Sequence, residues 1–225
     1  AADILLYYSK LLEDSDYKKN ILKNNNEEDP VTLADLKVNE IIIKRINEKY
    51  RGTNWDILSE ENIKTSKTFV TKNDWVWVLD PLDGTKDFIQ GTGNYAMHLA
   101  LNFKQKPFIG FVLIPDKNQL WITDGKKTWC EKRDGSKYEP ILLKNRNLHE
   151  MTLVTSKNHG NEILKNLIQK INFSKVQIMG SIGCKIASIV NGESDIYICL
   201  SLPGKSSPKD WDFAAPDSIL KAAGG

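Results

Sequence analysis

The sequence predicts a layered α/β or α+β fold with two subdomains. Its first half contains two strands, 95–103 and 107–114, joined by Lys-Gln-Lys-Pro, which is typical of an antiparallel hairpin. After Met151 the pattern changes to strands that alternate with helices, as in parallel α/β units. A length of 225 residues suits one large domain or two small ones that share a core. We therefore expect subdomains over residues 1–147 and 148–225.

Apolar periodicity predicts the remaining elements. Helical spacing of apolar residues indicates one helix over 3–12 and a second from Thr32 to about Tyr50. The other strands expected in the first half are 56–59 and 75–80, followed by a hairpin over 120–130 that turns at Asp124-Gly125. In the second half we expect strands at 152–156, 176–180 and 195–201, and helices that begin near Gly160, Gly183 and Trp211.

Composition excludes several classes of protein. With 40% hydrophobic and 27% charged residues, the chain has the composition of an ordinary soluble globular protein. A net charge of +2 with scattered lysines does not favour a nucleic-acid surface, and the apolar stretches are too short to span a bilayer. Its three cysteines lack metal-site spacing, which indicates a reducing, cytoplasmic compartment. We expect a small-molecule ligand, with no nucleic acid and no membrane as partner.

Carboxylates follow the predicted strands at points where layered α/β proteins often form a cleft. Asp80 and Asp83 come after a long apolar run, Glu60 and Glu61 follow a short one, and Asp212 opens the last helix. Converging carboxylates repel one another unless a cation neutralises them. A set of oxygen ligands favours Mg²⁺, Mn²⁺ or Ca²⁺ over zinc. The pattern therefore predicts a metal site.

Each of these acids also has an ordinary explanation. Adjacent glutamates most often lie on a solvated turn, Asp83-Gly84 is a common turn pair, and Asp212 can act as a helix N-cap. Their joint occurrence after hydrophobic strands favours the metal site over separate ordinary roles.

Gly84 and Thr85 form a candidate phosphate-binding segment. If a helix or turn begins there, its free N–H groups favour an anion, Gly84 lets a phosphate oxygen approach the backbone, and the Thr85 hydroxyl can position a water. Upstream, Thr32 and Asp35 match a capping box, which explains Asp35 without chemistry. The alternative is that Asp35 orients the Thr85 hydroxyl in an acid–hydroxyl–water relay.

Two competing motifs fail at single residues. Leu-Asp-Gly-Thr is shared with the haloacid-dehalogenase phosphatases, but Pro81 stands where their nucleophilic aspartate would be, so the covalent mechanism lacks its nucleophile. An EF-hand loop fails because Leu82 stands where that loop needs Asp or Asn.

Four motifs stand in the order found in the inositol-monophosphatase-like, lithium-sensitive phosphatase superfamily. They are Asp-Pro-Val-Thr-Leu-Ala-Asp (29–35), Ser-Glu-Glu (59–61), Asp-Pro-Leu-Asp-Gly-Thr (80–85) and Trp-Asp-Phe-Ala-Ala-Pro-Asp (211–217). The chain thus resembles that superfamily over most of its length. The resemblance implies an α/β fold, a layered α-β-α-β-α sandwich of the inositol monophosphatase/fructose-1,6-bisphosphatase type. Because members continue past the Ala-Ala-Gly-Gly at the end of this chain, it also implies a truncated second subdomain.

Three segments are similar to those of the 3'(2'),5'-bisphosphate nucleotidases within that superfamily. Lys86-Asp87-Phe88 replaces the Thr-Asn-Phe typical of inositol monophosphatases, and segments 155–159 and 180–198 resemble nucleotide-contacting segments. The resemblance implies a hydrolase that converts 3'-phosphoadenosine 5'-phosphate to AMP and phosphate, as part of sulfate assimilation. An inositol monophosphatase, a broad-specificity sugar phosphatase, and a non-catalytic protein that binds nucleotide or metal remain alternatives.

The resemblance also implies a role for each matching residue. Two or three Mg²⁺ ions would be bound by Glu60, Asp80, the carbonyl of Leu82, Asp83, Asp212 and, more weakly, Glu61. Mn²⁺ could replace Mg²⁺, and Li⁺ would inhibit the enzyme. Asp35 and Thr85 would activate the attacking water. The amides of Gly84 and Thr85 would cradle the scissile phosphate. The rest of the nucleotide would contact Ser156, His159, Ser181 and Lys185. Members are often dimers, so a homodimer is expected.

Overall fold

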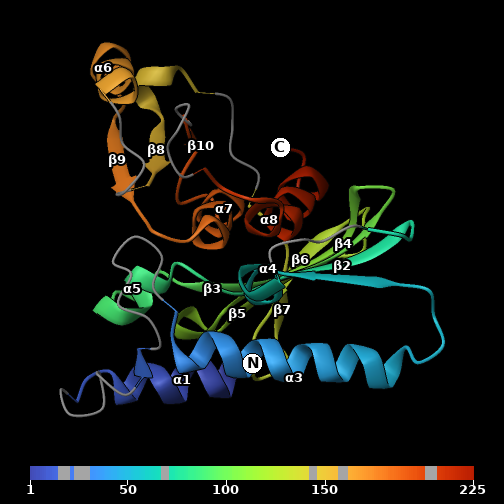
Figure 1. The fold of residues 1–225 in the computed structure, drawn as a ribbon. Helices are drawn as coiled ribbons and strands as arrows, with labels where there is room; N and C mark the ends of the chain where they lie inside the picture. Colours follow the sequence, from blue (N-terminus) through green and yellow to red (C-terminus); the bar gives the residue numbers. More distant parts are fainter. Residues whose placement is uncertain (15–20, 23–30, 67–70, 142–145, 157–161, 201–206) are drawn as a thin grey trace.

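The computed structural model has five layers in which helices and sheets alternate (Figure 1). It describes residues 1–14, 21–22, 31–66, 71–141, 146–156, 162–200 and 207–225. Helices α1 (Ala2–Leu11) and α3 (Leu33–Lys49) cover one face of a seven-stranded sheet. Helices α7 (Ile182–Val190) and α8 (Asp210–Ala222) separate that sheet from a three-stranded sheet, whose far side carries α6 (Glu162–Ile171). The predicted α-β-α-β-α sandwich is confirmed.

The strands of the larger sheet follow chain order. They are β1 (Asp56–Ser59), β2 (Trp75–Asp83), β3 (Ala96–Phe103), β4 (Lys106–Ile114), β5 (Gln119–Thr123), β6 (Thr128–Glu131) and β7 (Lys137–Tyr138). Only β1 and β2 pair in parallel, and the other neighbours are antiparallel. Both predicted hairpins are present, and Asp124 accepts the amides of Lys126 and Lys127 in the second turn. Strand β7 was not predicted.

Strand β2 continues further than its sequence indicated, through Asp83 instead of Asp80. Its register shifts between Asp80, which pairs with His98, and Asp83, which pairs with Ala96. In a regular strand, residues three apart point to opposite faces, and an irregularity of this kind re-aims a side chain. The shift contains Pro81, which has no N–H to donate to the ladder. Both aspartates can therefore face the same side of the sheet.

The smaller sheet contains parallel strands in the order β10 (Ile196–Tyr197), β8 (Thr152–Thr155), β9 (Lys175–Ile178). The strand predicted over 195–201 is thus much shorter, and its last residue lies outside the described part.

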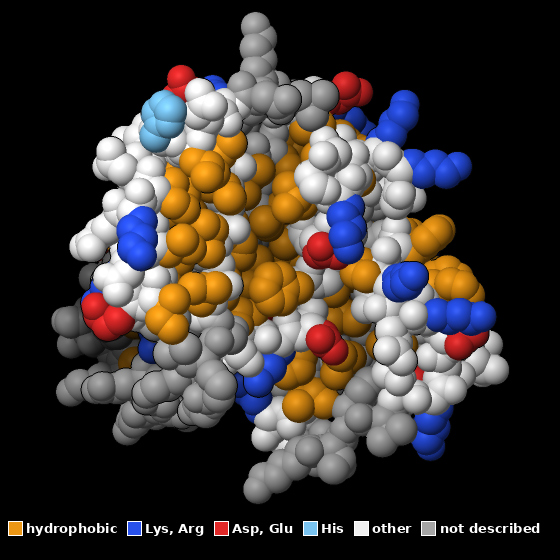
Figure 2. Space-filling model, turned by 90° about the horizontal axis from the view of Figure 1, so that it is seen from above, with side chains coloured by type: hydrophobic (Ala, Val, Ile, Leu, Met, Phe, Trp, Pro, Cys, Tyr) orange, Lys and Arg blue, Asp and Glu red, His pale blue; other side chains and the backbone are white. Residues whose placement is uncertain are grey.

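Exposed apolar side chains of this half include Ile163, Val176 and Ile178. Figure 2 shows that hydrophobic side chains gather on the face seen from above. An extensive apolar face is typical of an interaction surface, and the homodimer stays a prediction.

The main hydrophobic core joins the two halves of the chain. It brings Trp121 of β5 together with Cys184 of α7 and with Ala215 and Ile219 of α8. Gly110 on β4 permits this approach, because a Cβ there would lie 2.1 Å from the Ser218 hydroxyl oxygen. The predicted division between residues 147 and 148 stays a prediction, and the two halves bury their apolar surfaces against each other. No helix in the described ranges combines the length and apolar character needed to cross a membrane.

Candidate active site

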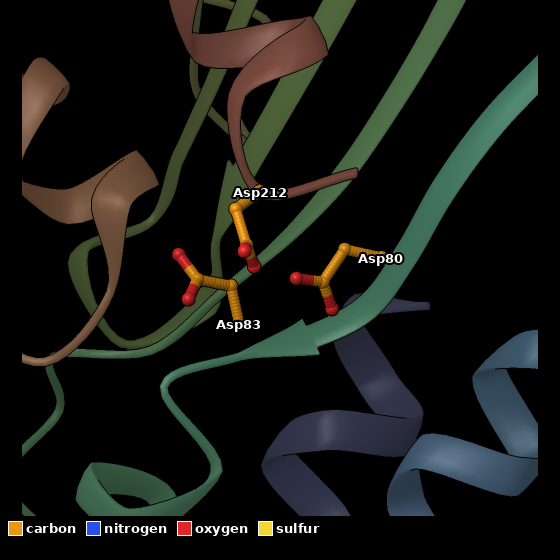
Figure 3. Close-up of side chains that lie close together, drawn as sticks. All are labelled: Asp80, Asp83 and Asp212. Carbon is orange, nitrogen blue, oxygen red and sulfur yellow. The ribbon is translucent and has the colours of Figure 1, made fainter. Parts of the chain in front are cut away.

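Three carboxylates converge between the end of β2 and the start of α8 (Figure 3). One oxygen from each of Asp80, Asp83 and Asp212 lies within 4.8 Å of the other two. The shifted register of β2 directs the first two aspartates to this place, and the first turn of α8 supplies the third. The predicted convergence of these acids is therefore present in the structure.

Burial and mutual repulsion make this cluster unstable as a set of bare charges. Asp80 is 1% exposed, and burial, followed by the charges of Glu60, Asp83 and Asp212, raises its pKa well above the usual value. Burial and then the charge of Asp83 raise the pKa of Asp212 to about 7. A divalent cation between the carboxylates would keep them ionised at neutral pH. Because the donors are all oxygen atoms, the site fits Mg²⁺ or Mn²⁺.

Helix α4 (Glu60–Ser66) follows β1 without a loop and brings two more acids to the site. The charge of Glu60 raises the pKa of Asp80, and Glu61 is buried beside them at 5% exposure. One turn later, the Lys64 ammonium lies 3.0 Å from a Glu60 oxygen and 3.4 Å from a Glu61 oxygen. The sequence analysis did not identify Lys64. Its position four residues after Glu60 and three after Glu61 on one helix could have indicated an ion pair with both.

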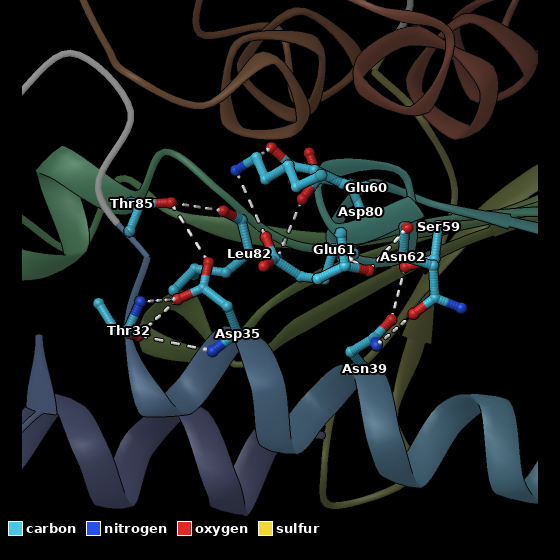
Figure 4. A network of polar contacts seen from close by, with 12 residues as sticks. Thr32, Asp35, Asn39, Ser59, Glu60, Glu61, Asn62, Asp80, Leu82 and Thr85 are labelled. Atoms are coloured by element: carbon cyan, nitrogen blue, oxygen red, sulfur yellow. Dashed lines mark hydrogen bonds and ion pairs between the residues drawn. The ribbon is translucent and has the colours of Figure 1, made fainter. Parts of the chain in front are cut away.

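A polar network, buried only at Ser59, joins the first turn of α4 to α3 (Figure 4). The Ser59 hydroxyl donates to the Asn39 side-chain oxygen, and the Asn39 amide donates to Asn62 at 3.1 Å. Ser59 is fully buried at the junction of β1 and α4. Asn39 therefore helps to place the neighbouring glutamates. It lies four residues after Asp35 on α3, and that helical spacing was a signal that sequence reasoning missed.

Asp35 uses its two carboxylate oxygens for two different purposes. One oxygen accepts the Thr32 amide at 2.8 Å and the Thr32 hydroxyl, completing the predicted capping box. The other lies 3.5 Å from the Thr85 hydroxyl oxygen (Figure 4). The capping role and the relay role are therefore compatible. Burial raises the pKa of Asp35 to about 7, with the charges of Glu61 and Glu60 adding to the effect.

The segment after Asp80 folds tightly around its own backbone. The Asp80 carboxylate accepts the Leu82 amide at 3.0 Å, and the Leu82 carbonyl accepts the Thr85 hydroxyl at 3.0 Å. Helix α5 (Thr85–Gln90) then begins after Gly84, which meets the condition set for a phosphate-binding segment there. Gly84 has a φ of 85°, and a Cβ there would lie 2.9 Å from the Asn94 carbonyl oxygen. Only glycine suits this position.

Asp83 is anchored from the other half of the chain. One of its oxygens accepts the Ser181 hydroxyl at 2.7 Å, the Ile182 amide, and the Gly183 amide at 3.2 Å. These groups form the start of α7, where the helix dipole favours negative charge. The Ser181 hydroxyl also caps α7 by accepting the Cys184 amide at 3.1 Å. In the described structure Ser181 thus supports Asp83, and its contact with substrate stays a prediction.

His98 on β3 is a neighbour of Asp83 that was not predicted. Its Nε2 lies 3.3 Å from the same Asp83 oxygen, and the side chain is buried. A Cβ on Gly183 would lie 2.3 Å from this nitrogen, so glycine is what lets α7 pack against the ring. Burial lowers the pKa of His98, which favours the neutral imidazole. The residue occupies an inward position of an apolar strand, where sequence alone indicates only burial.

Two of the four predicted nucleotide residues, Lys185 and Ser156, lie beside Tyr197 of β10. The Lys185 ammonium lies 5.3 Å from the centre of the Tyr197 ring and donates to the Gly180 carbonyl at 2.7 Å. Lys185 is fully buried, and burial lowers its pKa while the charge of Asp83 opposes that effect. Ser156 lies near Tyr197 as well. His159 is outside the described residues, and the substrate roles of these residues stay predictions.

Comparison with known proteins gives a consistent result. The model of the inositol monophosphatase family matches residues 1–225. The 3'(2'),5'-bisphosphate nucleotidase CysQ of Buchnera aphidicola is 32% identical over 198 residues, which cover 87% of this chain and 69% of that protein. A differently named relative, the Nus factor SuhB of Pasteurella multocida, is 27% identical over 228 residues, covering 96% of this chain and 77% of that protein.

A solved structure shows the same fold. The crystal structure of CysQ from Bacteroides thetaiotaomicron matches 99% of this chain and 82% of that one, with a TM-score of 0.72 and 24% identity. The layered fold and the acidic cluster of the described residues are consistent with the family model, which matches residues 1–225. The chain belongs to the inositol monophosphatase family, a family of phosphatases.

Proposed function

We propose that the chain is a Mg²⁺-dependent phosphatase that removes the 3'-phosphate of 3'-phosphoadenosine 5'-phosphate to give AMP and phosphate. The convergence of Asp80, Asp83 and Asp212 carries this proposal, because it provides an oxygen-lined site for divalent ions at the end of β2. The nucleotide is favoured by the 32% identity to a bisphosphate nucleotidase over most of both chains. Clearance of this nucleotide during sulfate assimilation in the cytoplasm is the cellular role we expect.

The carboxylate cluster would hold the ions through a small set of groups. These are Glu60, Asp80, the Leu82 carbonyl, Asp83 and Asp212, with Glu61 at the edge. Bound ions would neutralise the phosphate and lower the pKa of water. The protein prepares their place by burying Asp80 and by fixing Asp83 against the start of α7. Mn²⁺ as a substitute and Li⁺ as an inhibitor are expectations of the same proposal.

Asp35 and Thr85 would move the proton of the attacking water. The water donates a proton to the Thr85 hydroxyl oxygen while that hydroxyl passes its own proton to the facing Asp35 oxygen. In the structure the Thr85 hydroxyl donates to the Leu82 carbonyl at 3.0 Å and the Asp35 oxygen lies 3.5 Å away, so this route requires the hydroxyl to turn from Leu82 to Asp35. A pKa of about 7 suits a general base that works near neutral pH. The resulting hydroxide attacks phosphorus, and the bond from phosphorus to the 3'-oxygen breaks. The 3'-oxygen leaves with the electron pair and takes a proton from solvent water to become the 3'-hydroxyl of AMP, while Asp35 returns its proton to solvent.

Recognition of the nucleotide would use the second half of the chain. Lys185 and Ser156 lie around Tyr197, and the charge of Asp83 acts on Lys185, which supports a position beside the metal site. A lysine can neutralise a second phosphate group as a point charge. The amides of Gly84 and Thr85 would contact the scissile phosphate from the opposite side.

One assay tests the proposal against its alternatives. Phosphate release is measured from 3'-phosphoadenosine 5'-phosphate, from inositol 1-phosphate and from a sugar phosphate, each with Mg²⁺, with Mg²⁺ plus Li⁺, and with EDTA. We expect the highest kcat/KM for the nucleotide, inhibition by Li⁺, and no turnover in EDTA. A preference for inositol phosphate or sugar phosphate would overturn the nucleotide assignment. Nucleotide binding without turnover would identify a non-catalytic binding protein.

A further inference from the structure

Asp87 is a half-buried acid on the short helix α5, and no step of the proposed hydrolysis uses it. One of its carboxylate oxygens accepts the Thr92 hydroxyl at 2.6 Å, and its backbone carbonyl accepts the Thr92 amide at 3.1 Å. The Thr92 hydroxyl oxygen in turn accepts the Asn94 amide at 3.2 Å. These contacts within one short stretch of chain fix the direction of the Asp87 side chain.

The other carboxylate oxygen of Asp87 lies against Gly180, in the second half of the chain. A Cβ at Gly180 would overlap this oxygen and would lie 2.7 Å from the carboxyl carbon, so a glycine is what permits the contact. The Asn94 carbonyl accepts the Ser181 amide at 3.4 Å, which holds the same two segments together. Asp87 therefore packs on the segment that links β9 to α7.

Gly180 also holds the ammonium of Lys185. Its carbonyl accepts that ammonium at 2.7 Å, and the side chain is fully buried beside Tyr197. Burial lowers the pKa of Lys185, and the charges of Asp83 and Asp87 are among those that oppose this effect. Asp87 thus acts on Lys185 in two ways. It packs against the residue whose carbonyl binds the ammonium, and its charge favours the charged form of the lysine.

We propose that Asp87 is a positioning residue that holds Gly180 and, through it, the Lys185 ammonium, and so favours a substrate with a second phosphate group over a simple monophosphate. This inference rests on the proposed nucleotide phosphatase and identifies a residue that determines its substrate choice. Asp87 follows Gly84 and Thr85, the proposed seat of the scissile phosphate, on the same helix. It therefore connects that seat with the proposed place of the second phosphate.

A pair of substrates that differ by one phosphate group tests the proposal. We measure kcat/KM for 3'-phosphoadenosine 5'-phosphate and for adenosine 3'-phosphate, which lacks only the 5'-phosphate, and take the ratio of the two values. The variants are Asp87→Ala, Asp87→Asn, Lys185→Met and the double variant Asp87→Ala/Lys185→Met. Asp134→Ala is the matched control, because Asp134 also accepts a nearby hydroxyl at 2.6 Å but lies on an exposed turn. Circular dichroism melting establishes that each variant is folded.

We expect the ratio to fall about fivefold in Asp87→Ala, mainly through kcat/KM for the bisphosphate, and to stay unchanged in Asp134→Ala. Asp87→Asn keeps the shape of the side chain and should lower the ratio by only about twofold, so it keeps the proposal testable if Asp87→Ala does not fold. Because Asp87 acts through Lys185, the double variant should have the ratio of Lys185→Met alone. Equal losses on both substrates, an unchanged ratio in both Asp87 variants, or a further fall in the double variant would overturn the proposal.

Crystal structures of the wild type and of Asp87→Ala or Asp87→Asn separate this inference from the proposed function. We expect the Lys185 ammonium to leave the Gly180 carbonyl in Asp87→Ala and to stay close to it in Asp87→Asn. An ammonium that stays in place in Asp87→Ala would overturn the positioning role. If the ammonium moves but the wild type does not prefer the bisphosphate, Asp87 positions Lys185 and the proposed nucleotide function is wrong.

Discussion

The proposed hydrolytic side of the site and the proposed nucleotide side are built in different ways. The carboxylates and Thr85 lie at the ends of β1 and β2 and at the starts of α4, α5 and α8, where short motifs place them. The nucleotide side lies between α7, β8 and β10, where Lys185 is buried against Tyr197. This difference between the two sides leads us to expect that hydrolysis depends on local motifs in the larger sheet, whereas substrate choice depends on packing in the second half of the chain.

The strongest test of the hydrolytic side is Asp83→Asn. The amide keeps the shape of the side chain but removes the charge that a metal ion needs, so we expect kcat to fall about a thousandfold or more. Phosphate release from the nucleotide measures it. Asp217→Asn, on the exposed side of α8, is the control and should retain activity. Near-normal turnover in folded Asp83→Asn would contradict the assignment of Asp83 as a metal ligand required for catalysis.

Substitutions in the proposed proton relay should have the next largest effect on activity. Asp35→Asn and Thr85→Ala each break the pair whose oxygens lie 3.5 Å apart, and we expect kcat to fall by about 10² to 10⁴ with little change in KM. The wild-type rate should decline as pH falls below about 7, where Asp35 becomes protonated. Thr85→Ser keeps the hydroxyl and should recover most of the rate. Full activity of Thr85→Ala would show that the Thr85 hydroxyl does not transfer the proton of the attacking water.

Lys185→Met tests whether substrate choice belongs to the second half. The variant keeps an apolar stem against Tyr197 and removes the charge. We expect kcat/KM for the bisphosphate nucleotide to fall by about tenfold or more, because a charge-assisted contact with phosphate is lost. Hydrolysis of a simple monophosphate should change much less. Equal losses on both substrates would place Lys185 with the hydrolytic residues instead.

A smaller effect is expected from Asn39→Ala. Loss of the network to Ser59 and Asn62 should loosen the first turn of α4 and weaken Mg²⁺ activation by about tenfold, the scale seen when groups that orient metal ligands are removed. At saturating Mg²⁺, kcat should return towards the wild-type value. Titration of activity with Mg²⁺ measures both quantities. If kcat stays low at every Mg²⁺ concentration, Asn39 does not act through the metal site.

The smallest expected effect is on stability in the absence of metal. Asp35, Asp80 and Asp212 have raised pKa values in the folded protein, so the folded state holds their protons more tightly than the unfolded chain does. Their contribution to stability is therefore lost as pH rises from about 4 towards about 7. We expect the melting temperature in EDTA to fall by roughly 5 °C between pH 5 and 8.

Mg²⁺ should remove most of that fall, since ions bind the ionised carboxylates. Asp212→Asn should make the profile in EDTA flatter, and Asp217→Asn should leave it unchanged. Scanning calorimetry across the pH range measures the effect. A melting temperature in EDTA that rises steadily to pH 8 would contradict the raised pKa values.

Local signals predicted much of this site because local chemistry places it. The capping box of Thr32 and Asp35 and the helix start after Gly84 each involve residues only a few positions apart. Sequence reasoning missed contacts that cross the fold. Asp83 accepts the Ser181 hydroxyl from 98 positions away, and His98 reaches Asp83 only because β3 pairs with β2. The register shift around Pro81 escaped prediction because strand periodicity does not reveal a bulge.

The proposed function requires that Asp80, Asp83 and Asp212 form a metal site that the fold prepares in advance. Anomalous diffraction from crystals soaked in Mn²⁺ tests it most directly. We expect a strong anomalous peak among the three carboxylates, present in the wild type and lost in Asp83→Asn. A wild-type enzyme that turns over its substrate in the same Mn²⁺ buffer, but shows no peak between these carboxylates, would contradict it.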